Sequence, residues 1–238
     1  MPYRAPNQRA VTPQGRGRFP GFDVLEEVHR WDDVTAGVVL ARLAPTTDLS
    51  FFSLAEDGAA TALTDLLFAQ DDEPRVPVVA MIDARLAAGE TDGWHYDDMP
   101  QDAEAWRQTL AALDADAQDV AGTAFARLEH GNRAAIVQRV QDLGADAQQW
   151  RGLPAHRVWS LWTRYGCAAF YSHPWAWNEM GFPGPAYPRG YKNLGIDSRE
   201  PFEVADADGT DPVTSTRTVE QFRTARSRLL DSRLEGGS

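Results

Sequence analysis

The sequence predicts a mainly α-helical protein: one helical domain with an extended N-terminal arm and a long aromatic segment rich in proline and glycine. Three observations predict this fold class. Apolar residues recur at helical spacing in several segments after residue 53, strands and helices show no regular alternation, and the chain has no internal repeat. The chain has 238 residues, of which 43% are hydrophobic, and this is enough for one sizeable core.

Residues 1–21 are rich in proline, glycine, arginine and glutamine, which predicts an extended or disordered basic arm. The arginines of this arm are Arg4, Arg9, Arg16 and Arg18, and no acidic residue accompanies them within residues 1–20. Because the whole chain has a net charge of −12, setting these four positive charges aside leaves −16 on the remaining 218 residues. One interpretation of the arm is a solvated tail, and the other is an arm that binds an acidic partner. The acidic remainder argues against binding to nucleic acid or to anionic lipid.

Local signals place the first helices. Residues 24–43 are ambiguous between a short strand and the end of a helix. A clear helix begins after Ser53, because Ser53 and Glu56 form a capping box. The next helix is predicted at about 76–88, with Gly89 as a left-handed cap.

Two amphipathic helices follow. Asp102 is predicted to be the N-cap of the first, because apolar residues recur behind it at steps of three and four. These apolar residues are Trp106, Leu110, Leu113, Ala117 and Val120. The second helix is predicted at about 132–143, with Gly144 at its end.

The most apolar helix is expected at about 155–171, opened by Pro154. Apolar side chains cover most of its circumference, which predicts a central, buried position. Cys167 is the only cysteine of the chain, and it is expected to be buried in this helix. After an acidic loop at 204–213, a final helix is predicted near 217–230.

The residues argue against a redox centre or a metal site in this chain. A thiolate-bound iron–sulfur cluster needs about four cysteines, and a covalent haem needs a Cys-x-x-Cys-His run that the chain lacks. The five histidines are scattered without the spacing of metal ligands. No strand precedes the N-terminal glycines, so they do not form a dinucleotide-binding loop. We therefore expect no catalytic residue, cofactor or metal ion in this chain.

Residues 170–191 form the most distinctive stretch, in which aromatic residues alternate with prolines and glycines. The prolines and glycines are predicted to prevent a regular helix or a central strand, so the segment must lie on another surface. One interpretation is a loop that covers the chain's own helices. The other is a surface that docks a partner, since Trp, Tyr and Arg anchor protein interfaces. The residues predicted to bind the partner are Tyr171, His173, Trp175, Trp177, Asn178, Tyr187, Arg189 and Tyr191.

This stretch resembles the signature of a known family. Residues 171–179, Tyr-Ser-His-Pro-Trp-Ala-Trp-Asn-Glu, and 184–191, Gly-Pro-Ala-Tyr-Pro-Arg-Gly-Tyr, are similar to the signature of the gluconate 2-dehydrogenase subunit 3 family. Residues 69–79 and 83–94 add support. The resemblance covers about residues 50–203.

The resemblance implies a place in a dehydrogenase complex. Family members are small subunits of membrane-associated or periplasmic dehydrogenases. Their catalytic partner is a large flavoprotein, similar to the glucose–methanol–choline oxidoreductases, that binds FAD and oxidises a hydroxyl of a sugar, sugar acid or glycoside. A cytochrome or another acceptor takes the electrons. The small subunit is thought to act like a chaperone that supports folding, stability or export of the large one, and the family supplies no catalytic residue to carry over.

The sequence therefore predicts a non-catalytic accessory subunit, spanning residues 22–233, that binds a large FAD-dependent dehydrogenase subunit. Two alternatives stay open. In one, His173, Asn178 or Arg189 contributes to the dehydrogenase active site; in the other, the chain is a stand-alone carbohydrate-binding module. Residues 234–238 are interpreted as a cloning remnant.

The sequence also bears on location. No secretory signal is visible, and no apolar run reaches the roughly 18 residues of a membrane span. Many family members carry a twin-arginine signal, and this chain shows none. We therefore expect a cytoplasmic complex without direct membrane insertion. Export together with a partner, or trimming of a signal, would instead place it in the periplasm.

Overall fold

The computed structural model of the chain describes residues 19, 21–43, 48–71, 75–192 and 199–205. The chain divides into two units, Met1–Val204 and Ala205–Ser238, and all the elements below belong to the first. Nearly all of the predicted arm, most of the predicted acidic loop, the predicted C-terminal helix and the last five residues lie outside the described residues.

The described residues form a mainly helical fold, which confirms the predicted fold class. The elements in chain order are η1 (Val24–Arg30), α1 (Asp33–Ala41), α2 (Leu54–Phe68), α3 (Val78–Ala87), α4 (Asp102–Ala121), η2 (Phe125–Arg127), α5 (His130–Ala145), β1 (Gln149–Trp150), β2 (Leu153–Pro154), α6 (Ala155–Phe170) and α7 (Pro174–Met180). Strands β1 and β2 pair antiparallel, with Trp150 opposite Leu153. Among the described residues, no helix is both long enough and apolar enough to cross a membrane.

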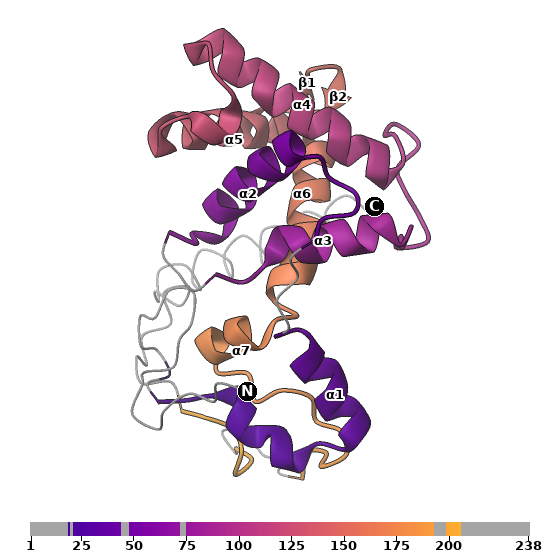
Figure 1. Ribbon diagram of the computed structural model, residues 1–238, viewed down its shortest axis with the longest axis vertical. Coiled ribbons are helices and arrows are strands. Elements are labelled where there is room, and N and C mark those ends of the chain that lie inside the picture. The colour runs from indigo at the N-terminus through magenta and orange to yellow at the C-terminus, as the bar shows by residue number, and fades with distance from the viewer. Residues whose placement is uncertain (1–18, 20, 44–47, 72–74, 193–198, 206–238) are drawn as a thin grey trace, which may run out of the picture. The chain divides into compact units, whose positions relative to one another are not determined.

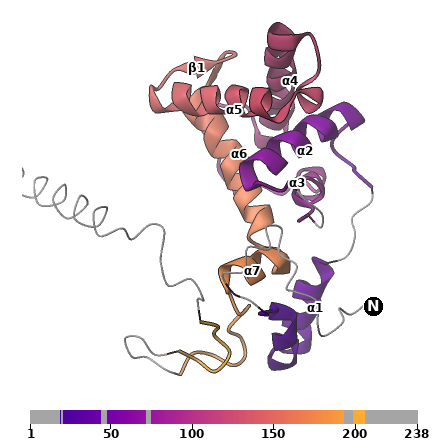
Figure 2. The ribbon, with the colours of Figure 1, turned by 90° about the vertical axis from the view of Figure 1, so that its left-hand side faces the viewer.

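Helix α6 lies at the centre of the main core, as its apolar circumference predicts. It contacts α2, α3, α4 and α5, and Figures 1 and 2 show these helices packed around it. The Trp162 indole N–H donates to Thr109 Oγ1 of α4 at 3.1 Å, so this buried ring leaves no unpaired donor. At Gly166, a Cβ would lie only 2.7 Å from the Phe68 ring of α2. Glycine at this position therefore permits α2 and α6 to approach closely.

Two helix-end signals are confirmed. Ser53 Oγ accepts from the Glu56 N–H at 3.4 Å and Glu56 Oε2 accepts from the Ser53 N–H at 2.8 Å, so a capping box begins α2. Gly89 follows α3 with a φ of +66°, the predicted left-handed conformation.

Helix α3 begins two residues later than predicted. Val76 precedes Pro77, and a residue before proline disfavours the helical conformation.

Asp102 is the first residue of α4, so its predicted N-cap role is wrong. Gln101 occupies the cap position. The Asp102 carboxylate instead accepts from the Tyr165 hydroxyl at 2.7 Å and from Arg164 Nη2 at 3.0 Å, both on α6. The Asp102 carboxylate thus binds residues more than sixty positions away in sequence, although the local pattern predicts that it binds the start of its own helix.

Of two further local predictions, one is wrong. Cys167 is exposed, because it lies with Ala168 on the side of α6 that the core leaves uncovered. Gly144 lies at the end of α5 as expected, although the helix continues to Ala145 and so includes it. A Cβ at this position would lie 3.1 Å from the His156 Cα, so glycine permits the close approach of α5 to the start of α6.

The N-terminal elements form a second hydrophobic cluster with part of the aromatic segment. Residues 24–43, ambiguous in the sequence, are helical and form η1 and α1. Val24, Trp31 and Val39 of this stretch are buried together with Trp177 of α7. Elements from opposite ends of the described chain thus share one small core.

Candidate partner-binding surface

Helix α7 lies within the aromatic segment, where the sequence predicted no regular helix, and that prediction is wrong. Pro174 stands at the first helical position, where its missing N–H costs no hydrogen bond and its fixed φ suits the helix. Gly181 follows the helix with a φ of +66° and closes it in the left-handed conformation. The proline and the glycine that argued against a helix instead define its two ends.

His173 caps the start of α7. It is 1% exposed, and burial lowers the pKa of its imidazole to about 4, although a hydrogen bond with the Arg42 backbone acts in the opposite direction. The neutral ring accepts the N–H of Trp175 on Nδ1 at 3.2 Å, and Trp175 itself is half-buried against the main core. Arg42 Nη1 also donates to the Ser172 carbonyl at 2.7 Å. These contacts fix the turn between α6 and α7.

Trp177 and Asn178 bind the N-terminal elements to α7. The Trp177 indole N–H donates to the Tyr171 carbonyl at 2.7 Å, and its ring completes the second cluster. Asn178 Oδ1 accepts from the Val24 N–H at 2.7 Å, and its Nδ2 donates to Asp23 Oδ1 at 3.3 Å. Both side chains are buried, so they hold the surface together from inside.

Two glycines after α7 lie in close contact with the rings of Phe19 and Trp31, near the N-terminus. A Cβ on Gly181 would lie 2.6 Å from the ring of Phe19, and a Cβ on Gly184 would overlap the ring of Trp31. Both glycines also have positive φ, +66° and +79°, which side chains rarely adopt. The close approach of Phe19 and Trp31 therefore requires glycine at positions 181 and 184.

Arg189 joins three segments of the chain. Its Nη1 pairs with Glu27 of η1 at 3.3 Å, and its Nη2 donates to the Pro183 carbonyl at 2.7 Å. The guanidinium lies over the Phe202 ring, 3.7 Å from the ring centroid. Burial lowers the pKa of Arg189, while the Glu27 carboxylate opposes this shift. The residue is thus occupied by contacts within its own chain.

The exposed part of the segment is aromatic and apolar. Among the eight predicted residues, Tyr171, Tyr187 and Tyr191 are exposed, and Tyr187 is the most exposed at 67%. Met180 and Phe182, which the sequence prediction missed, are also exposed. These two residues flank Gly181 directly in the sequence, so their place inside the aromatic segment was a signal that could have found them. We call these five side chains the docking surface.

Helix α1 also presents an unpartnered apolar face that the sequence prediction missed. Val34, Gly37, Val38 and Ala41 are all exposed, and Val34 is exposed at 74%. Their spacing of three, one and three residues places them on one side of the helix. That spacing was the available signal, but the ambiguity of residues 24–43 concealed it.

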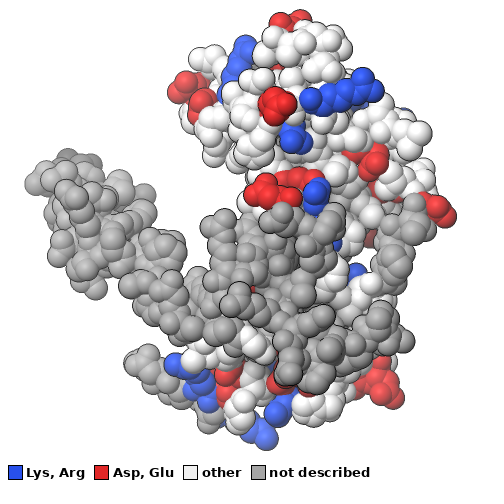
Figure 3. All heavy atoms as spheres, turned by 60° about the vertical axis from the view of Figure 1, so that its left-hand side comes forward, with Lys and Arg blue, Asp and Glu red and all other residues white. Residues whose placement is uncertain are grey.

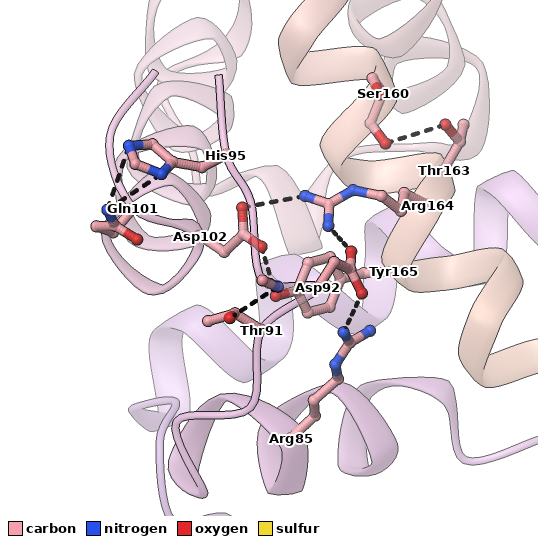
Figure 4. A network of polar contacts seen from close by, with 11 residues as sticks. Arg85, Thr91, Asp92, His95, Gln101, Asp102, Ser160, Thr163, Arg164 and Tyr165 are labelled. Atoms are coloured by element: carbon pink, nitrogen blue, oxygen red, sulfur yellow. Dashed lines mark hydrogen bonds and ion pairs between the residues drawn. The ribbon is translucent and has the colours of Figure 1, made fainter. Parts of the chain in front are cut away.

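A separate polar network fastens the loop between α3 and α4 to α6. Figure 4 shows Asp92 between Arg85 and Arg164, and its carboxylate pairs with both guanidinium groups. Arg164 and Tyr165 also meet the Asp102 carboxylate. Burial, together with the hydrogen bond to Asp102, raises the pKa of Tyr165 to about 12, so its hydroxyl remains a donor at ordinary pH. The charges pair with one another, so the arrangement is that of a structural network.

Neither the charged residues in Figure 3 nor the residue types that bind metals mark a second site among the described residues. In Figure 3, basic and acidic residues are interspersed over the described part of this face. No group of three or more His, Cys, Asp or Glu among the described residues could hold a metal ion. The docking surface is therefore the candidate functional site, and its chemistry suits protein association.

Comparison with known proteins identifies the family of the chain. No curated protein and no solved structure matches the chain significantly. The family described as gluconate 2-dehydrogenase subunit 3 matches residues 55–184, which run from α2 through α7 to Gly184. This match covers more than half of the 238 residues. The chain therefore belongs to the gluconate 2-dehydrogenase subunit 3 family and is an accessory subunit of a dehydrogenase complex.

Proposed function

We propose that the chain is the small, non-catalytic subunit of an FAD-dependent dehydrogenase of the glucose–methanol–choline type, and that it binds and stabilises the large subunit. The large subunit would carry FAD and oxidise a hydroxyl of a sugar, sugar acid or glycoside, and would pass electrons to a cytochrome or another acceptor. Family membership supports the accessory role. The nature of the partner rests on the resemblance alone.

The docking surface is the single observation that carries the binding role. An aromatic side chain has roughly 150–250 Å² of surface, so the exposed parts of the five side chains amount to on the order of 500 Å². A stable interface buries about 800 Å² per partner, so the docking surface would supply a large share of one.

The buried members of the segment support binding over an active-site role. His173, Asn178 and Arg189 are the three side chains that such a role would use. His173 Nδ1, both polar atoms of the Asn178 amide, and Arg189 Nη1 and Nη2 contact the backbone and side chains of this chain. General acid–base work requires hydrogen-bond reach of the reacting group, and these side chains are already engaged elsewhere.

Co-expression with the large subunit tests the binding role. Met180→Ala with Tyr187→Ala removes two exposed members of the docking surface without touching its buried contacts. We expect this double variant to weaken binding by at least about tenfold, as the loss of interface anchors does, and to lower the flavin content recovered in the large subunit.

The matched control is Leu54→Ala with Val120→Ala, which removes two exposed apolar side chains from α2 and α4. This control should bind as tightly as the unaltered chain. Equal binding by the two double variants would contradict the docking role. A large subunit that co-purifies without flavin would contradict the FAD-dependent partner and leave the docking role intact.

A further inference from the structure

One side of α6 extends the exposed surface away from the docking surface. Tyr171, a member of the docking surface, directly follows α6 and keeps the helical conformation. Cys167 and Ala168 are exposed as well, and Arg164 is half-buried. These four residues stand at steps of three, one and three, so they share one side of the helix over about 10 Å. The uncovered side of α6 is therefore continuous with the docking surface at Tyr171.

An exposed aromatic side chain lies at the far end of this side. Trp94, in the loop between α3 and α4, is 47% exposed. The Arg164 guanidinium lies 5.1 Å from the centroid of the Trp94 ring, and the Tyr96 ring meets the same ring edge-on, with 5.0 Å between the centroids. We call Trp94, Arg164, Cys167 and Ala168 the α6 strip.

Ion pairs fix the loop that carries Trp94. Two residues before it, Asp92 pairs with Arg164 of α6 and with a second arginine on α3, as Figure 4 shows. Four residues after it, Asp98 pairs with Arg157 of α6 at 3.4 Å. The loop is thus fastened to α6 on both sides of Trp94. An aromatic ring that is already held in place loses little entropy when a partner covers it.

A cavity opens between α3 and α6 along the α6 strip. Its volume is about 250 Å³, and Met81 of α3 and Ala168 of α6 contribute to its lining. The lining runs from Arg85, which pairs with the Asp92 carboxylate, to Ser172, which is next to Tyr171. The cavity therefore lies between the two ends of the strip, and it has room for a side chain from outside this chain.

We propose that the large subunit covers the α6 strip together with the docking surface, and that one of its apolar side chains fills the cavity. This inference rests on the proposed function and extends the interface. The docking surface exposes on the order of 500 Å², whereas a stable interface buries about 800 Å² per partner. The strip adjoins the docking surface at Tyr171, so a single partner covers both.

The chemistry of the strip favours an apolar partner surface. The Arg164 guanidinium already pairs with Asp92 and with Asp102, so the strip offers no unpaired arginine to an acidic partner. Its other members are an indole, a thiol and a methyl group. Tryptophan and arginine are also among the residue types that most often anchor interfaces.

Alkylation of Cys167 tests this inference on the full chain, because Cys167 is the only cysteine of the sequence. The free chain and its complex with the FAD-loaded large subunit are treated with N-ethylmaleimide, and mass spectrometry follows the labelling of this chain. We expect the large subunit to slow the reaction at least about tenfold, because a thiol must be accessible to react. The matched control, Cys167→Ala with Ala135→Cys, moves the single thiol to an exposed position on α5. Its thiol should react equally fast in the free chain and in the complex.

Affinity for the large subunit gives a second measurement. Ala168→Arg places a long charged side chain on the strip, and Ala135→Arg makes the same change at the exposed position on α5. We expect Ala168→Arg to weaken binding at least about tenfold and the control to bind like the unaltered chain. Arginine suits exposed positions within helices, so both variants should unfold at the same urea concentration as the unaltered protein.

The outcomes separate the strip from the docking role. Equal alkylation of Cys167 in the free chain and in the complex would overturn the inference, and so would equal affinities of the two arginine variants. If Met180→Ala with Tyr187→Ala still weakens binding, either result leaves the proposed function standing. Protection of Cys167 that rises with the concentration of the isolated chain would assign the strip to a second copy of this chain, against the inference. Absence of binding by the unaltered chain would overturn the proposed function itself.

Discussion

The side chain of Asn178 accepts a hydrogen bond from the backbone N–H of Val24 at 2.7 Å, although 154 residues separate the two in sequence. The bond is buried, and Asn178 also donates to Asp23 beside it. A buried N–H without a partner costs free energy, so this bond favours the packing of η1 on α7. The docking surface is thus held in place by a polar contact between distant parts of the chain.

Asn178→Ala should therefore destabilise the protein by about 1–3 kcal/mol, because it leaves the buried Val24 N–H without an acceptor. Urea unfolding measures the loss. Asn132→Ala is the matched control, since Asn132 is exposed in the first turn of α5 and should change the free energy of unfolding little. Equal effects of the two substitutions would contradict the structural role of Asn178.

Gly184→Ala should destabilise the protein more than Gly190→Ala. Both glycines have positive φ, +79° and +67°, so alanine at either position costs roughly 1–2 kcal/mol of backbone strain. Only at Gly184 does the new Cβ meet the Trp31 ring, and such overpacking costs a further 1–3 kcal/mol or so. Thermal unfolding of the two variants compares these costs. A Gly184→Ala protein no less stable than its Gly190→Ala counterpart would argue against the ring contact.

His173 should make stability depend on pH. Its folded-state pKa of about 4 lies below the ordinary value of 6.5, so the unfolded chain binds a proton in this range that the folded chain does not. The stability that the neutral ring supplies is therefore complete above about pH 6.5 and is lost as the pH falls towards 4. The loss amounts to roughly 3 kcal/mol at most.

His173→Asn separates this titration from that of the carboxylates. Asparagine keeps an acceptor at the cap of α7 and has no proton to gain. Urea unfolding between pH 7 and pH 4.5 should show a smaller loss of stability in this variant than in the unaltered protein. Parallel pH profiles for the two proteins would mean that His173 does not carry the effect.

Tyr165→Phe should lower the free energy of unfolding by about 1–2 kcal/mol. The substitution removes the hydroxyl that donates to the buried Asp102 carboxylate at 2.7 Å, and leaves that oxygen without this partner. Tyr171→Phe is the matched control, because Tyr171 is 47% exposed and no hydrogen bond of its hydroxyl is seen among the described residues. Chemical unfolding of both variants tests the network, and equal stability would refute its contribution.

Sequence signals within a few residues of one another predicted structure correctly. Ser53 and Glu56 are three residues apart and begin α2 by bonding to each other, and Gly89 ends α3 through its own backbone freedom. The periodicity of α4 placed Trp106 and Leu113 in the core, although Val120 at its far end is exposed. Such predictions succeed because the interacting groups belong to one turn or one face of a single element.

Predictions that depended on distant partners failed. Asp102 does not cap α4, because its carboxylate binds Tyr165 and Arg164 instead. Cys167 is exposed, because its apolar sequence neighbours do not show which side of α6 the core covers. The sequence predicted that Pro174 and the later glycines interrupt regular structure. Pro174 instead begins α7, and Gly181 and Gly184 accommodate the rings of Phe19 and Trp31, which are distant in sequence.

The sequence by itself determined the helical fold and the family, since both rest on residue types and their spacing along the chain. Only the tertiary structure decided which members of the aromatic segment face outward. His173, Trp177 and Asn178 turn inward because their polar atoms find partners nearby in space, whereas Tyr171, Tyr187 and Tyr191 stay exposed. Burial depends on what packs against a side chain, and for these residues the packing elements include segments from the other end of the described chain.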